Sequence, residues 1–100
     1  MVQDIDDVVE VLRTVMPRHP EIRKVCLFGS FARGEQGPDS DVDLLAVPEG
    51  RRTYAQDFSM REDLRNALGR DVDVVTTLDG APRYFVEQLR RDGVCIYGRN

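Results

Sequence analysis

The chain has 100 residues, of which 41% are hydrophobic and 32% charged, and its net charge is −4 from 14 basic and 18 acidic side chains. This length predicts one globular domain over residues 1–100, and the acidic balance argues against avid free-standing binding to nucleic acid. No apolar run approaches the roughly 20 residues of a membrane helix, and the acidic residues 1–7 do not resemble a signal peptide, so we expect a cytoplasmic protein with no membrane partner.

The hydrophobic pattern predicts helices that alternate with strands. Apolar residues recur at helical spacing over residues 4–16, and Pro17 and Pro20 should end this helix. His19 lies in the turn that follows, where we expect it to be exposed and inert. Further helices are expected over residues 30–35, 52–68 and 82–91, and strands over residues 24–28, 42–47, 71–76 and 94–97. This order predicts a small α/β (α+β) domain with a mixed sheet of about four strands and helices packed on it.

The apolar residues of the two later helices indicate which side chains should pack against the sheet. For residues 52–68 the expected apolar stripe is Tyr54, Phe58, Leu64, Ala67 and Leu68. For residues 82–91 it is Tyr84, Phe85, Val86 and Leu89. Arginines gather on the same two segments: Arg61, Arg65 and Arg70, then Arg83, Arg90 and Arg91. We expect these to be solvated helix faces in preference to a docking surface for an acidic or phosphorylated partner.

The two cysteines, Cys26 and Cys95, both lie in apolar, strand-like segments. Neither belongs to a spacing typical of metal binding or of a redox motif. The simplest expectation is two reduced thiols in the core.

A Gly29-Ser30 pair follows the apolar strand at residues 24–28 and opens the next short helix. Glycine permits close approach of the backbone to a ligand, the serine hydroxyl can donate to a phosphate oxygen, and amides at a helix start attract anions. Arg33, one helical turn later, is placed to reach a phosphate or to hold the loop through Asp39. A Gly-Ser pair alone is an ordinary strand-to-helix turn, so this signal needs support from elsewhere in the chain.

Three aspartates supply that support. Asp41 and Asp43 are at i and i+2 on an expected strand and should share one face. Such a pair is also common in solvated turns, but oxygen ligands of this kind suit Mg²⁺, which is held by one or two carboxylates plus substrate phosphates. If the third strand lies beside the second, Asp73 faces the pair, and three carboxylates fit two metal ions for in-line phosphoryl displacement. Asp71 shares the face of Asp73 but lies at the start of its strand, where solvation is expected.

Together these segments resemble the signature of the minimal nucleotidyltransferase family, within the DNA polymerase β-like nucleotidyltransferase superfamily. The matching residues are Gly29-Ser30-x-Ala32-Arg33-Gly34, then Ser40-Asp41-x-Asp43-Leu44, and Asp73 within Val72-Asp73-Val74-Val75. The resemblance covers nearly the whole chain. It implies that Asp41, Asp43 and Asp73 bind two catalytic Mg²⁺ ions and that Gly29 and Ser30 hold the triphosphate. It also implies that Arg33 and Ser40 support the loop or contact phosphate.

The family resemblance further implies transfer of AMP from ATP to a hydroxyl, with release of pyrophosphate. Larger superfamily members carry a second domain that shapes the acceptor site, so we expect the acceptor to come from a partner, a second copy or the substrate. Minimal nucleotidyltransferases are commonly paired with a HEPN-type ribonuclease toxin, and act as antitoxins that adenylylate a toxin tyrosine. The resemblance therefore implies a HEPN toxin partner and leaves homo- or hetero-oligomers open.

Two other functions remain open from the sequence. In one, the domain neutralises its partner by contact alone and catalysis is dispensable. In the other, it modifies a small molecule or a nucleic acid with an acceptor site on another chain. The complete set of three aspartates favours the enzyme over the binding module, and the acidic balance argues against a nucleic-acid substrate.

Overall fold

A computed structural model describes residues 1–98. The elements are α1 (Ile5–Val15), η1 (Met16–Arg18), β1 (Ile22–Phe28), α2 (Ser30–Arg33), β2 (Val42–Pro48), α3 (Tyr54–Leu68), β3 (Val72–Val75), α4 (Arg83–Asp92) and β4 (Val94–Gly98). The predicted order of helices and strands is confirmed, with the short 3₁₀ turn η1 added at Pro17. Within the described residues no helix is both long and apolar enough to cross a bilayer.

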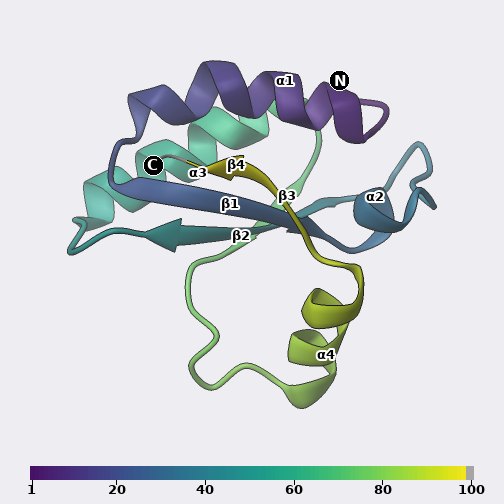
Figure 1. The fold of residues 1–100 in the computed structure, drawn as a ribbon. Coiled ribbons are helices and arrows are strands. Elements are labelled where there is room, and N and C mark those ends of the chain that lie inside the picture. Colours follow the sequence, from purple (N-terminus) through teal and green to yellow (C-terminus); the bar gives the residue numbers. More distant parts are fainter. Residues whose placement is uncertain (99–100) are drawn as a thin grey trace.

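The four strands form one mixed sheet in the order β3-β2-β1-β4 (Figure 1). β1 pairs antiparallel with both β2 and β4, whereas β2 and β3 are parallel. The expected fold class, a small α+β domain with helices on a mixed sheet, is confirmed. The parallel pairing of β2 and β3 matters most for function, because it brings the aspartates of both strands to the same end of the sheet.

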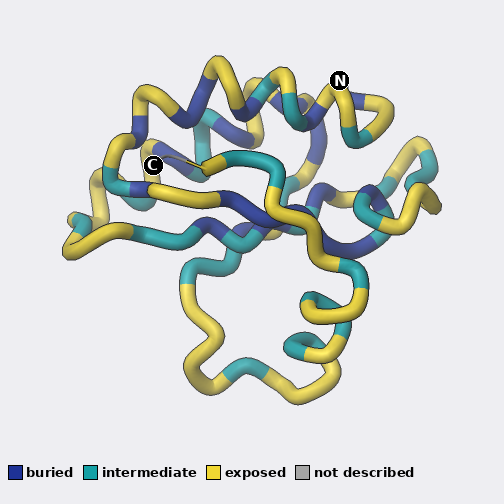
Figure 2. Tube along the Cα trace, viewed as in Figure 1, coloured by how far each residue is buried: buried dark blue, intermediate teal, exposed yellow. Residues whose placement is uncertain are grey.

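The hydrophobic core lies between the sheet and the two long helices, α1 and α3, on one face of the sheet (Figures 1 and 2). Side chains in it include Val8, Leu12, Val25, Leu27, Val42, Leu44, Met60, Leu64 and Leu68. α3 begins at a capping box formed by Thr53 and Gln56 and ends at Gly69 in the left-handed conformation. Because strand residues alternate between faces, the intervening side chains point to the opposite face of the sheet.

The predicted apolar stripe of α3 is partly wrong. Tyr54 is 97% exposed and Phe58 68% exposed, and Ala67 is also exposed, whereas Met60 takes a core position that was not expected. Phe58 precedes Leu64 by six residues, which places it about 120° away around the helix axis. The aromatic residues of α3 therefore face solvent although they recur at helical spacing.

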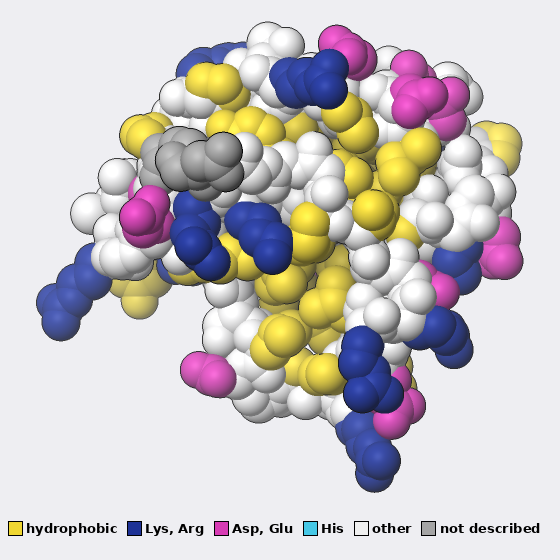
Figure 3. Space-filling view, in the orientation of Figure 1, with side chains coloured by type: hydrophobic (Ala, Val, Ile, Leu, Met, Phe, Trp, Pro, Cys, Tyr) yellow, Lys and Arg dark blue, Asp and Glu magenta, His cyan; other side chains and the backbone are white. Residues whose placement is uncertain are grey.

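α4 lies on the opposite side of the sheet from α1 and α3 (Figure 1). It is anchored by Phe85, whose ring meets that of Phe28 edge-on with centroids 4.9 Å apart. None of its residues is fully buried, and Tyr84 is 73% exposed, so the expected packing of this helix is only partly realised. Hydrophobic side chains gather between β4 and α4 in Figure 3. α4 thus covers only part of this face of the sheet.

His19 is buried, contrary to the expectation of an exposed and inert side chain. Its Nε2 lies 2.6 Å from Oδ2 of Asp63, and the ring therefore ties the turn after α1 to α3. The partner is 44 residues away in the chain, so no local pattern indicates this contact.

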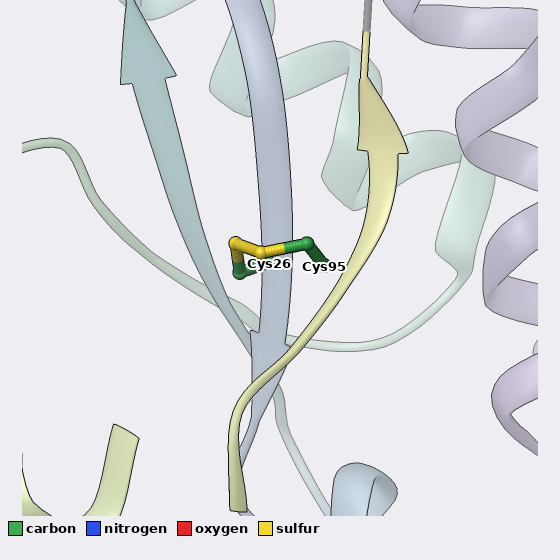
Figure 4. The surroundings of a disulfide bond; sticks show 2 residues. All are labelled: Cys26 and Cys95. Carbon is green, nitrogen blue, oxygen red and sulfur yellow. A yellow bond between two sulfur atoms is a disulfide. The ribbon is translucent and has the colours of Figure 1, made fainter. Parts of the chain in front are cut away.

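The expectation of two reduced cysteines is also wrong: Cys26 of β1 and Cys95 of β4 form a disulfide (Figure 4). The two residues are register partners in the antiparallel pair, with Cα atoms 3.8 Å apart. The sequence places both in strands but does not reveal that β1 and β4 are neighbours. The bond fastens β4 to the centre of the sheet.

Reduction of this disulfide is expected to lower the thermal stability of the protein. The bond joins residues 69 apart, for which the chain-entropy description gives roughly 4 kcal/mol and typical proteins show about 2–4 kcal/mol. We therefore expect the Tm to fall by about 10 °C or more when dithiothreitol is added, followed by circular dichroism. The double variant Cys26→Ser, Cys95→Ser should melt at one temperature with or without reductant. Equal Tm values for the oxidised and reduced wild-type protein would contradict the prediction.

Candidate active site

The turn after β1 is built around Gly29, which adopts φ 77° and ψ −155°. This conformation is essentially restricted to glycine. A Cβ atom at this position would collide with the carboxylate of Asp43, lying 3.0 Å from its Cγ atom. The turn and the carboxylate are thus packed against each other, and glycine is required here for both conformation and space.

Asp43 and Asp73 are paired in register on the parallel strands β2 and β3. The condition on which Asp73 was expected to face the pair, adjacency of these two strands, is therefore met. Asp41 lies two residues before Asp43, just ahead of β2, and is exposed like Asp73, while Asp43 is half-buried. Alternation along the strands places Asp43 and Asp73 on the sheet face away from α1 and α3.

The electrostatics show how closely these groups interact. The pKa of Asp43 is raised from 3.8 to about 6, first by burial, then by the negative charges of Asp73 and Asp41. The guanidinium of Arg33 acts in the opposite direction and lowers it. The three carboxylates therefore repel one another in the absence of a cation, and α2 contributes a positive charge beside them.

Arg33 does not hold the loop through Asp39, so that part of the prediction is wrong. Its Nε donates to Oε2 of Glu35 at 3.1 Å, and its Nη1 lies 3.5 Å from Oδ2 of Asp92 at the end of α4. The pair with Asp92 connects α2 with α4, whereas the pair with Glu35 is local. Whether Arg33 also contacts phosphate stays a prediction.

Ser30 and Ser40 occupy different kinds of position. Ser30 is the first residue of α2, which is a single turn of four residues and so contributes little helix dipole. It is partly exposed beside Gly29. Ser40 Oγ accepts a hydrogen bond from the backbone N–H of Gly37 at 2.8 Å, which closes the turn before Asp41. Of the two roles expected for Ser40, the geometry corresponds to support of the loop.

The donor set suits a hard divalent cation, because it consists of carboxylate oxygens whose mutual repulsion such an ion would relieve. Among residues 1–98, however, no three His, Cys, Asp or Glu side chains form a closed metal-binding group. These observations are compatible with an open site, in which substrate phosphates complete the coordination of the ion. A hollow of about 530 Å³ is lined by Ser40, Asp41 and Asp71 together with the end of α3, but not by Asp43, Asp73 or Gly29, so it adjoins the site only at Asp41.

Arg70 is the residue whose importance the sequence did not reveal. It was expected on a solvated arginine face but is only 8% exposed. Its guanidinium donates to carbonyl oxygens of the loop that leads to Asp41. Its position directly after Gly69 could have drawn attention to it, but nothing local predicts burial.

The chain belongs to the polymerase beta nucleotidyltransferase family, whose model matches residues 10–100. It is therefore a nucleotidyltransferase, as the arrangement of the Gly29 turn and the paired aspartates on a mixed sheet also indicates. The family expected from the sequence is confirmed.

Individual relatives extend this result. A protein of Methanocaldococcus jannaschii, named provisionally as a protein adenylyltransferase, is 28% identical over 97 residues, covering 95% of this chain and 97% of that protein. The protein adenylyltransferase MntA of Shewanella oneidensis is 25% identical over 89 residues, covering 89% of this chain and 63% of that protein. A crystal structure of a toxin–antitoxin with AMP-PNP has a TM-score of 0.66 and 25% identity, covering 95% of this chain and 73% of that one.

Proposed function

We infer that this protein is an Mg²⁺-dependent protein adenylyltransferase that moves AMP from ATP to a tyrosine hydroxyl of a HEPN-type ribonuclease toxin and thereby acts as its antitoxin. The observation that carries the proposal is the in-register pair of Asp43 and Asp73, with the Gly29 turn packed against Asp43. This pair lies on the sheet face that α1 and α3 leave open. A nucleotide can therefore approach the carboxylates without displacement of the core.

In the proposed reaction the acceptor oxygen forms a bond to the α-phosphorus of ATP. The bond from that phosphorus to the bridging oxygen breaks, pyrophosphate leaves, and the proton of the acceptor hydroxyl passes to solvent. Mg²⁺, held by Asp41, Asp43 and Asp73, would neutralise the triphosphate and lower the pKa of the acceptor hydroxyl. Gly29 lets the backbone approach the triphosphate, and Ser30 donates its hydroxyl to a phosphate oxygen.

The choice of acceptor rests on the relatives. MntA of Shewanella oneidensis is named a protein adenylyltransferase, and a structure of similar fold is a toxin–antitoxin with AMP-PNP, an analogue of ATP. The resemblance to minimal nucleotidyltransferases adds the HEPN class of toxin. Exposed aromatic side chains such as Tyr54 and Tyr84 leave apolar surface available for a protein partner.

The test is transfer of label from [α-³²P]ATP to a HEPN-type toxin in the presence of Mg²⁺. We expect label on the toxin with the wild-type protein and loss of toxin ribonuclease activity in proportion to the label. The variant Asp41→Asn, Asp43→Asn should give no label, and EDTA should abolish label with the wild type. Mass spectrometry of the labelled peptide then tests whether the modified residue is a tyrosine, and replacement of that tyrosine by phenylalanine should abolish the label.

Two outcomes would contradict the proposal. If the double variant neutralises the toxin as well as the wild type and no label is seen, contact alone is the mechanism. If label appears on a small molecule or a nucleic acid and the toxin stays unlabelled, the acceptor is wrong. The affinity of the wild-type protein and of the double variant for the toxin should also be measured, so that loss of label is not confused with loss of the complex.

A further inference from the structure

Arg70, which lies in the chain between the end of α3 and the start of β3, carries a buried positive charge. The side chain is 8% exposed, and within residues 1–98 it forms no ion pair with a carboxylate. A buried charge is costly unless its hydrogen-bonding groups are satisfied. The partners that satisfy this one therefore indicate what the residue holds in place.

Most of these partners lie in a single loop. Nη1 of Arg70 is 3.0 Å from the carbonyl oxygen of Gly37, 3.2 Å from that of Pro38 and 3.0 Å from that of Ser40. Nε donates to the carbonyl oxygen of Val2 at 2.7 Å. Hydrogen bonds from a charged donor are stronger than neutral ones, and three of these contacts converge on the loop from α2 to β2.

The same guanidinium also contacts α2. Its Cζ atom lies 5.0 Å from the centroid of the Phe31 ring, a distance typical of a cation–π contact. Phe31 is 2% exposed and directly follows Ser30, while Ser40 directly precedes Asp41. One side chain thus contacts the element that begins at the phosphate turn and the loop that ends at the carboxylates.

The loop has few other restraints. Within it, Ser40 Oγ accepts from the N–H of Gly37, and the N–H of Ser40 donates to the carbonyl oxygen of Gly37. Gln36 Nε2 donates to the carbonyl oxygen of Gln3. The first two bonds close the turn on itself, and neither connects it to the Gly29 turn. Arg70, by contrast, contacts both the loop that leads to Asp41 and Phe31 in the helix that begins at the Gly29 turn.

We propose that Arg70 is a positioning residue for nucleotidyl transfer: it sets the distance between the Gly29-Ser30 turn and the Asp41-Asp43 pair. This inference rests on the proposed function, because it assigns a role in that reaction. Arg70 itself contacts neither the carboxylates nor the turn. Lysine cannot replace it, because a single ammonium group cannot bond the loop and Val2 together while lying flat on Phe31.

The experiment compares Arg70→Lys and Arg70→Met with Arg13→Lys and Arg13→Met. Arg13 is a matched control, since it is an exposed arginine of α1 that pairs with Glu10 one helical turn away. We measure Tm, kcat and KM for ATP in the transfer reaction, and amide hydrogen exchange by mass spectrometry. For Arg70→Lys we expect a folded protein whose kcat falls about 10- to 100-fold with KM for ATP changed less than threefold. Exchange should accelerate at least tenfold over residues 36–41 and stay unchanged in α1. The Arg13 variants should match the wild type.

A merely structural role predicts a different result. The Tm would fall, but kcat measured well below that Tm would stay within twofold of the wild type, and this would overturn the proposal. Unchanged exchange over residues 36–41 in Arg70→Lys would also overturn it. If the wild-type protein shows no transfer, the proposed function fails, and the exchange data still decide whether Arg70 fixes this loop. If Arg70→Met does not fold, Arg70→Lys alone carries the test.

Discussion

Replacement of Asp43 by asparagine is expected to abolish nucleotidyl transfer and, at the same time, to stabilise the metal-free protein. Asparagine has the shape of aspartate, so it fits against Gly29, but it lacks the charge that would hold Mg²⁺ in the proposed reaction. Loss of a metal ligand removes several kcal/mol of transition-state stabilisation, which corresponds to a fall in kcat of about 10³-fold or more. The gain in stability follows first from the burial of the Asp43 carboxylate and then from its repulsion by Asp73 and Asp41, which together raise its pKa.

The sign of the pH dependence follows from the pKa of Asp43, which is about 6 in the folded protein against 3.8 as the ordinary value. Between these pH values the folded protein binds more protons than the unfolded chain, so the free energy of unfolding falls as the pH rises. The penalty is absent below about pH 4 and complete above about pH 7. After allowance for solvent screening at a half-exposed site, it amounts to roughly 1 kcal/mol, or about 4–8 °C in Tm.

The measurement is the Tm of wild type and Asp43→Asn in EDTA from pH 4 to pH 8, beside steady-state transfer activity with Mg²⁺. The variant should melt higher than the wild type at pH 8 and equally at pH 4. Asp79→Asn, a loss of charge on the exposed loop before α4, is the control and should change neither quantity. A variant that is less stable than the wild type at pH 8, or one that is fully active, would refute the prediction.

The longer elements of the fold were predictable because each is encoded by local sequence signals. The helical spacing over residues 4–16 and the apolar runs of β1 and β2 need no knowledge of the tertiary structure. Strand neighbours could be anticipated only conditionally: Asp73 was expected to face Asp43 if β2 and β3 are adjacent, and their register pairing meets that condition.

Contacts between distant parts of the chain could not be predicted in the same way. The Cys26–Cys95 bond forms because β1 and β4 are neighbours. The contact of His19 with Asp63 forms because the turn after α1 packs against α3. Arg70 shows the limit most clearly, because its partners are backbone carbonyls, and the sequence pattern of a loop does not reveal where its carbonyl groups point. The candidate site residues that the structure brings together, Asp43 and Asp73, were thus readable from the sequence, while the contacts that fix their surroundings were not.

Replacement of Gly29 by alanine is expected to destabilise the protein and to remove its activity. Two costs combine at this residue: the backbone conformation, which alanine avoids at about 1–3 kcal/mol, and the collision of the new Cβ atom with the Asp43 carboxylate. We expect a loss of about 3 kcal/mol or more of stability. In the proposed reaction the displaced carboxylate would no longer hold Mg²⁺ in the productive geometry, so we also expect at least a 10²-fold loss of kcat.

Gly34→Ala separates the two costs, since Gly34 has φ 72° and ψ 22° and nothing lies within 4 Å of a Cβ atom there. It should lose only about 1–2 kcal/mol, with kcat within a few-fold of the wild type. Urea denaturation of Gly29→Ala, Asp43→Ala and the double variant then forms a cycle. If the collision is the cause, Gly29→Ala costs less stability when the Asp43 carboxylate is absent, and only the conformational cost remains. Strict additivity in this cycle would mean that the turn and the carboxylate are energetically independent, and that the requirement for glycine at residue 29 comes from its backbone conformation alone.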